Sequence, residues 1–110
     1  MIPESIKISA RGGSGLQVGQ KNYLHDSPGV YSYFDIKGNL LYIGKATSLK
    51  HRVGSYFNNK RLDPRIAEMV SHIARIDYIE TPSVLEALVL EANQIKAKKP
   101  KYNVLERDDK

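Results

Sequence analysis

Side chains suited to handling a phosphate group gather in the middle of the sequence. They are three phenols and two cations: Tyr31, Tyr42, Lys45, Arg52 and Tyr56. Cations can neutralise charge that develops on a phosphate, and a phenol with a lowered pKa can take a proton from water. Singly, each tyrosine is more often a packing residue of a strand, and each cation a solvated surface charge. Phosphate chemistry therefore requires that the chain bring these five side chains together.

A further candidate is the carboxylate of Glu91, on the last predicted helix. The apolar stripe of this helix consists of Val84, Leu85, Leu88, Ala92 and Ile95. At about 100° per residue, Glu91 lies at the margin of that stripe. A carboxylate at the border of the interior is costly unless a metal ion or a basic side chain meets it. From the residues alone, an Arg or Lys partner is the more common outcome.

The elements that must position these residues begin with a hairpin. Pro28 and Gly29 open it, and the runs "VYSYF" and "LLYIG" flank the turn sequence "DIKGN". Strand alternation places Tyr31 and Tyr33 on one face of the first strand. The second run carries Tyr42.

A short helix follows in "ATSLKHRVGSYF", with Thr47 or Ser48 as its cap. Arg52 and Tyr56 are four residues apart and therefore lie side by side on this helix. Lys45 comes just before the helix. The hairpin exit, the helix start and one helix face thus converge on one place.

The rest of the chain predicts two more helices and a third strand. "LDPRIAEMVSHIARI" has Asp63 as cap and Pro64 in its first turn, and "IDYIET" alternates like a strand. The last helix opens with a capping box at Ser83 and Glu86 and ends at Pro100. "KYNVLERDDK" is predicted to trail behind it.

The predicted order ββααβα favours a small three-stranded antiparallel sheet flanked by helices, an α/β protein of the α+β type. We expect one domain over residues 28–110. Residues 1–27 form an N-terminal extension that is partly flexible, because "RGGSG" at positions 11–15 is typical of a flexible joint. No Gly-Lys-Ser or Gly-Lys-Thr follows these glycines, so we do not expect them to form a phosphate-binding loop.

Composition narrows the classes of function. A nucleic-acid partner and solubility alone explain the net charge of +5 about equally well. The chain has no cysteine, so it can form neither a disulfide nor a thiolate metal site. His25, His51 and His72 lie on separate segments and are expected at the surface. No apolar run could cross a bilayer and no secretory signal opens the chain, so we expect a cytoplasmic protein.

The segments "PGVY", "YIGKATSLKHRVGSYF" and "EALVLEANQIKAKKPKYNVLERDDK" resemble the GIY-YIG nucleases. "LEAN" and "PKYNV" are similar to the branch of this family that belongs to the excinuclease of bacterial nucleotide excision repair. The resemblance runs from Pro28 to Lys110, and Val30 replaces the family's isoleucine, as is common in this branch. It implies a metal-dependent DNA endonuclease that hydrolyses one phosphodiester bond, like the 3′-incision domain of the excinuclease.

The resemblance gives the five central residues their roles. Tyr31 and Tyr42 would be the two motif tyrosines, with Tyr42 as the general base or as the phenol that orients the water. Lys45 would support the base or the phosphate. Arg52 would stabilise the charge on the phosphate, and Tyr56 would complete the hydrogen-bond network.

The resemblance also implies a metal site and a positioning residue. Glu91 would be the only protein ligand of one divalent cation, the rest of the shell being water, which suits Mg²⁺. Mn²⁺ is expected to substitute. Asn103 matches a motif asparagine that positions the site.

The implied partner is DNA, joined by the damage-loading protein of the excinuclease if the chain is part of the full repair protein. No membrane partner is expected, and the domain is expected to be monomeric. Alternatives are a free-standing small nuclease with another role in DNA processing, a non-cutting nucleic-acid-binding module, and a structural domain. The presence of Tyr42, Arg52 and Glu91 argues against a module that has lost its activity.

Overall fold

The computed structural model describes residues 4–7, 24–58 and 61–106. Their four strands form one antiparallel sheet in the spatial order β1-β4-β2-β3. The strands are β1 (Glu4–Lys7), β2 (Gly29–Phe34), β3 (Leu40–Ala46) and β4 (Arg75–Glu80). The helices are α2 (Leu49–Asn58), α3 (Pro64–His72), α4 (Val84–Lys98) and α5 (Lys101–Glu106). None of these described helices is long and apolar enough to cross a membrane.

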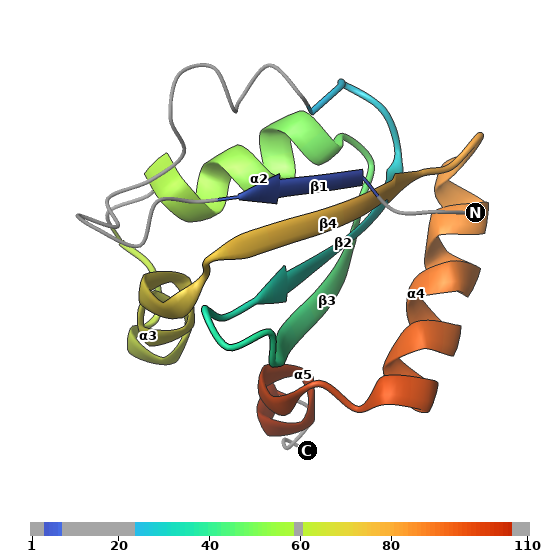
Figure 1. The fold of residues 1–110 in the computed structure, drawn as a ribbon. Helices are drawn as coiled ribbons and strands as arrows, with labels where there is room; N and C mark the ends of the chain where they lie inside the picture. Colours follow the sequence, from blue (N-terminus) through green and yellow to red (C-terminus); the bar gives the residue numbers. More distant parts are fainter. Residues whose placement is uncertain (1–3, 8–23, 59–60, 107–110) are drawn as a thin grey trace.

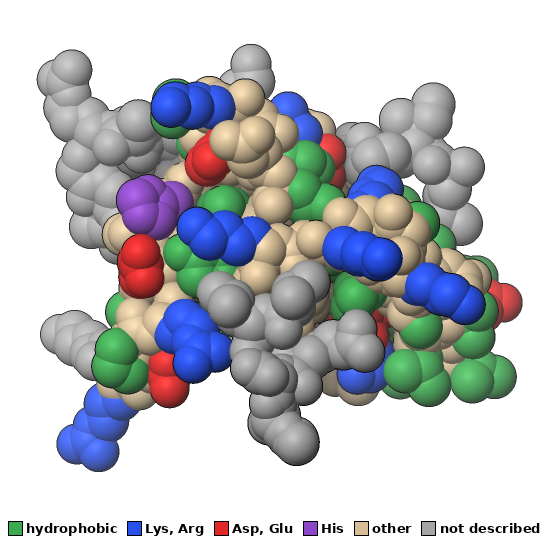
Figure 2. Space-filling model, turned by 90° about the horizontal axis from the view of Figure 1, so that it is seen from below, with side chains coloured by type: hydrophobic (Ala, Val, Ile, Leu, Met, Phe, Trp, Pro, Cys, Tyr) green, Lys and Arg blue, Asp and Glu red, His purple; other side chains and the backbone are tan. Residues whose placement is uncertain are grey.

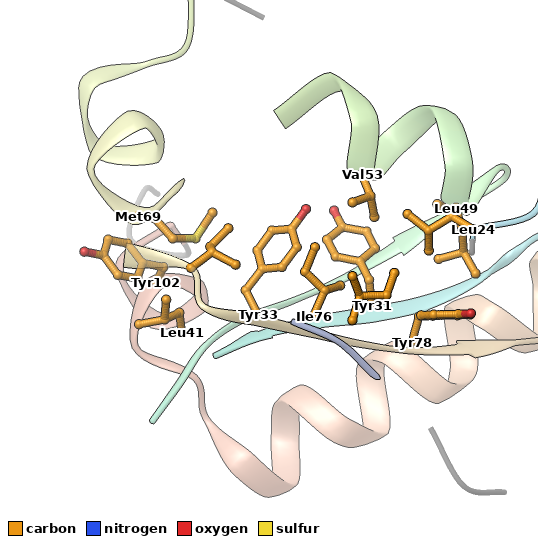
Figure 3. Packing of buried hydrophobic residues seen from close by; sticks show 13 residues of the cluster. Leu24, Tyr31, Tyr33, Leu41, Leu49, Val53, Met69, Ile76, Tyr78 and Tyr102 are labelled. Carbon is orange, nitrogen blue, oxygen red and sulfur yellow. The ribbon is translucent and has the colours of Figure 1, made fainter. Parts of the chain in front are cut away.

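Helices cover both faces of the sheet (Figure 1). The alternation of β2 divides the core between them. Tyr31 and Tyr33 point toward α2 and α3, where Val53 and Met69 pack in the larger hydrophobic cluster (Figure 3). Val30 points to the opposite face and packs with Ala87 of α4 in a smaller cluster.

The predicted hairpin is confirmed. β2 and β3 pair so that Tyr31 lies opposite Gly44 and Tyr33 opposite Tyr42. The turn forms because Asp35 Oδ1 accepts hydrogen bonds from the backbone amides of residues 37 and 39. Gly38 adopts the positive φ of 86° that glycine tolerates best.

The predicted helix caps are also present. Asp63 accepts a hydrogen bond from the amide of Arg65 at the start of α3, and Ser83 accepts one from the amide of Glu86 at the start of α4. Of the two candidates for the cap of α2, Ser48 accepts a hydrogen bond from the amide of His51.

The prediction of three strands is wrong, because β1 adds a fourth. β1 lies within the segment predicted as an N-terminal extension and pairs with β4. The Ser5 hydroxyl donates a hydrogen bond to Asp77 Oδ1 across this pair, at 2.6 Å. A four-residue strand shows too little periodicity to be recognised in the sequence. The predicted joint at residues 11–15 lies outside the described residues.

Two details at the C-terminal end also differ from the prediction. The segment after Pro100 is helical from Lys101 to Glu106, because Lys99 takes a left-handed conformation that ends α4 and lets the chain turn. In α4, four residues of the predicted apolar stripe are exposed rather than packed in the core: Val84, Leu85, Leu88 and Ala92.

Candidate active site

Four tyrosines form one aromatic cluster on the α2 side of the sheet. They are Tyr31 and Tyr33 of β2, Tyr42 of β3 and Tyr56 of α2. The ring centroids of Tyr31 and Tyr33 lie 5.1 Å apart, and those of Tyr31 and Tyr56 lie 5.9 Å apart. The hydroxyls of Tyr31 and Tyr56 are 3.0 Å apart and share a hydrogen bond. The structure therefore brings together the three phenols selected from the sequence, with Tyr33 between them.

Close packing requires glycine at two positions, Gly29 in "GVY" and Gly44 in "YIG". A Cβ atom on Gly44 would overlap the hydroxyl and ring of Tyr31. A Cβ atom on Gly29 would overlap the backbone carbonyl of Ile79 and the side chain of Leu49, which fixes β2 close to β4 and α2. The tyrosine of "GVY" thus requires the glycine of "YIG" for a steric reason: the Tyr31 ring occupies the space that a side chain on Gly44 would need.

Replacing Gly44 by alanine is expected to destabilise the protein by about 1–3 kcal/mol, because the ring of Tyr31 is fully buried and cannot move aside. Thermal unfolding measures the loss. The matched control is Gly54→Ala in α2, where the nearest heavy atom to an added Cβ is 3.8 Å away. That change should raise the melting temperature slightly, since alanine favours helix over glycine. Equal melting temperatures for the two variants would contradict the steric role of Gly44.

Burial keeps the inner phenols protonated. Loss of water contact raises the pKa of Tyr31 well above its ordinary value of 10, and the neighbouring Tyr33 adds to the effect. Burial likewise raises the pKa of Tyr33, although the Arg52 cation partly opposes the shift. Within the part of the chain that the structure describes, no group hydrogen-bonds to the Tyr33 hydroxyl. Tyr31 is therefore suited to donating or accepting a hydrogen bond, not to acting as a phenolate base.

The two predicted cations meet in a pocket of about 420 Å³. Lys45 at the end of β3 and Arg52 of α2 both line it, as the convergence of hairpin and helix predicts. The remaining lining residues are Ala46, Thr47, Ser48, His51, Ser55 and Val84. Two cations and several hydroxyls around an open pocket fit a phosphate group.

Glu91 lies on the α4 side of the sheet, next to Lys45. Lys45 Nζ is 3.9 Å from Glu91 Oε1, and the glutamate side chain is 17% exposed against 45% for the lysine. The basic partner expected from the residues alone is thus present. Lys45 links the carboxylate to the phosphate pocket, because it also lines that pocket.

Among the described residues, Glu91 could hold a metal ion only as a single carboxylate ligand. Within residues 4–7, 24–58 and 61–106, no three His, Asp or Glu side chains lie close enough together to form a metal site. A mostly buried carboxylate beside an open pocket suits a hard cation such as Mg²⁺, which keeps several of its own waters.

Asn103 of α5 acts on the backbone of β3. Its side-chain oxygen accepts a hydrogen bond from the amide of Ile43 at 2.7 Å, and its side-chain nitrogen donates one to the carbonyl of Ile43 at 2.9 Å. Ile43 lies between Tyr42 and Gly44, so the buried amide of Asn103 steadies both. Asn103 does not line the phosphate pocket.

The histidines are exposed, as predicted. His25 Nδ1 lies 2.6 Å from Glu80 Oε2, and His51 Nε2 lies 3.8 Å from Asp26 Oδ2. The sequence prediction missed that His51 also lines the phosphate pocket. Its position one residue before Arg52, in the helix already assigned to the site, was the available signal.

Comparisons with known proteins identify the same family that the sequence motifs resemble. The sequence model of a family described as the UvrC-like GIY-YIG domain matches residues 27–104. The UvrABC system protein C of Dechloromonas aromatica is 55% identical over 87 residues, which cover 79% of this chain and 14% of that protein. The protein of the same name from Neisseria gonorrhoeae is 55% identical over 83 residues, which cover 76% and 14%. The chain thus spans about one seventh of the length of these relatives.

A solved structure is also similar. It is the crystal structure of the GIY-YIG N-terminal endonuclease domain of UvrC from Thermotoga maritima, bound to its catalytic divalent cation, magnesium. The TM-score is 0.68 at 33% sequence identity, and the match covers 76% of this chain and 91% of that one.

Proposed function

The chain belongs to the family of UvrC-like GIY-YIG domains, and we propose that it is an endonuclease domain that hydrolyses one phosphodiester bond of DNA with the help of a divalent metal ion. The resemblance seen in the sequence motifs is thereby confirmed. The observation that carries the proposal is the pocket where Lys45 and Arg52 meet, with Lys45 also 3.9 Å from Glu91 Oε1.

The chain's own residues account for binding and proton handling. Lys45 and Arg52 hold the scissile phosphate and neutralise the charge that develops on it. Tyr31 stays protonated and fixes the hydroxyl of Tyr56 through their shared hydrogen bond. Tyr42, which is only half-buried, orients the attacking water or takes its proton. Asn103 keeps the strand that carries Tyr42 in place.

Glu91 would hold the metal ion, with water completing the shell. Mg²⁺ fits the single carboxylate, and Mn²⁺ should substitute. When bound, the cation supplies Lewis-acid stabilisation of charge on a phosphate oxygen.

The wider role rests on the relatives. Their name, UvrABC system protein C, supports a place for this domain in the UvrABC system. The motif resemblance adds that its role there is 3′ incision during bacterial nucleotide excision repair. Residues 28–110 would then be the nuclease domain, to which the extension at 1–27 adds β1. The domain would act on DNA in the cytoplasm as a monomer, after the damage-loading protein of the excinuclease has placed it. A free-standing nuclease with another role in DNA processing is the alternative.

Supercoiled plasmid tests the activity directly. We expect the purified protein to convert it to nicked circles with Mg²⁺ or Mn²⁺, and excess chelator to stop the reaction. Protein that retards plasmid on a gel but nicks it with neither metal would be a non-cutting binding module.

Replacing Arg52 by alanine should slow the chemical step by roughly 10²-fold or more, because it removes a charge that stabilises the transition state. Single-turnover nicking at saturating protein measures that step. The controls are alanine variants of Lys96, Lys98 and Lys99 near the end of α4. They should weaken binding and reduce its salt dependence by about one unit of slope for each lost phosphate contact. Equal losses in the chemical step from both groups would reduce Arg52 to an ordinary surface charge.

A further inference from the structure

Four apolar side chains lie exposed on the first two turns of α4. These residues, here called the apolar ridge, are Val84, Leu85, Leu88 and Val89. Among the described residues the only other exposed large hydrophobic side chain is Ile36, in the hairpin turn. Figure 2 shows apolar side chains gathered on the side of the molecule where α4 lies, with basic side chains beside them. An exposed apolar patch of this kind, next to a candidate active site, is typical of a binding surface.

The apolar ridge is continuous with the candidate active site. Val84 lines the pocket that contains Lys45 and Arg52. On a helix, residues spaced by four and by seven share a side, so Val84, Leu88 and Glu91 face the same way. Leu85 and Val89 lie directly next to them and are the more exposed, at 68% and 53%. The ridge therefore begins at the phosphate pocket and borders the proposed metal ligand.

The same helix face becomes basic farther along. Lys96 lies eleven residues after Leu85, about three turns, and points in nearly the same direction. Lys98 and Lys99 follow at the end of α4 and are also exposed. At a rise of about 1.5 Å per residue, Leu85 and Lys96 are roughly 16 Å apart.

We propose that the apolar ridge binds unpaired nucleotides next to the phosphate that is cut. Lys45 and Arg52 at one end of the ridge and Lys96 at the other suit the phosphates of a strand that runs along α4. The apolar ridge between these cations suits bases that have left the stack. A protein partner seated on the ridge would lie one helical turn from Glu91 and against the pocket wall, in the path of the substrate. The proposal rests on the proposed nuclease function and adds a preference for locally unpaired DNA.

The test is the double variant Leu85→Ser/Val89→Ser, which leaves the pocket lining and Glu91 untouched. Binding is measured by fluorescence anisotropy with two labelled duplexes, one fully paired and one with a short unpaired bubble. Chelator is present throughout, so that cutting does not interfere. We expect about tenfold weaker binding to the bubble duplex, since the variant removes two apolar side chains that would be buried against the bases. Binding to the paired duplex should change little.

Two control variants separate this effect from others. Ile36→Ser removes an equally exposed apolar side chain in the hairpin turn and should change neither affinity. Lys96→Gln should weaken binding to both duplexes and lower the salt slope by about one unit. Thermal unfolding of each variant shows whether the fold is retained.

Three results would overturn the proposal. The first is unchanged binding by the double variant, and the second is an equal loss of affinity for the two duplexes. The third is a wild-type protein that sediments as a dimer while the double variant sediments as a monomer, since the ridge would then bind a second copy. Because the assay needs no cutting, it is independent of the plasmid test. A wild-type protein that fails to nick plasmid while the double variant loses bubble binding would refute the nuclease function but not the ridge.

Discussion

Replacing Glu91 by glutamine is expected to abolish metal-dependent nicking while the protein stays folded. The change removes the negative charge that a divalent cation needs and keeps the shape of the side chain. Among the described residues, no three acidic or histidine side chains form an alternative metal site. Stability should fall by at most about 1 kcal/mol, because the ion pair that Glu91 loses spans 3.9 Å to a half-exposed Lys45.

Plasmid nicking and calorimetric titration with Mn²⁺ together measure the effect of Glu91→Gln. The matched control is Glu86→Gln, a change of the same kind on an exposed residue in the first turn of α4. It should leave both cutting and metal binding unchanged. Nicking by Glu91→Gln at the wild-type rate would show that the metal assignment is wrong.

Replacing Tyr42 by phenylalanine is expected to leave the protein nearly inactive with little change in melting temperature. Phenylalanine keeps the ring and its contacts with Tyr33 and Tyr56, whose centroids lie 6.3 and 6.4 Å away, and removes only the hydroxyl. A free phenol has a pKa of about 10, so Tyr42 needs nearby positive charge to act on water at neutral pH. Single-turnover nicking is the measurement.

Tyr33→Phe is the control. Tyr33 lies directly opposite Tyr42 in the hairpin and belongs to the same cluster, but it is fully buried. Its hydroxyl has no hydrogen-bond partner among the described residues, so its removal breaks no such bond and should not lower stability. Activity should be nearly normal. Similar activity in Tyr42→Phe and Tyr33→Phe would reduce the role of Tyr42 to packing.

Local patterns predicted much of the fold and of the site. The hairpin followed from strand alternation and turn residues, and the side-by-side placement of Arg52 and Tyr56 followed from helical spacing. These features depend on residues close together in the chain. The role of Gly44 did not follow, because it is set by the Tyr31 ring on the neighbouring strand.

Features set by distant contacts could not be predicted. β1 exists only through its pairing with β4, about seventy residues later. The spacing of apolar residues in α4 fitted a buried stripe, but the sheet contacts the side that carries the small Ala87 instead. The part of α4 that stays exposed depends on how much of the sheet is left to cover, which periodicity does not encode.

The contact between Asn103 and Ile43 also bears on how the protein is made. β3 is one of the two edge strands of the sheet, and an open edge strand is a template on which other chains can aggregate. Asn103 occupies the amide and carbonyl of Ile43 as a neighbouring strand would, yet it follows Ile43 by sixty residues. During synthesis the hairpin therefore leaves the ribosome well before the residue that protects its edge. The nascent chain is most prone to mispairing in that interval, and the site is complete only when α5 has emerged.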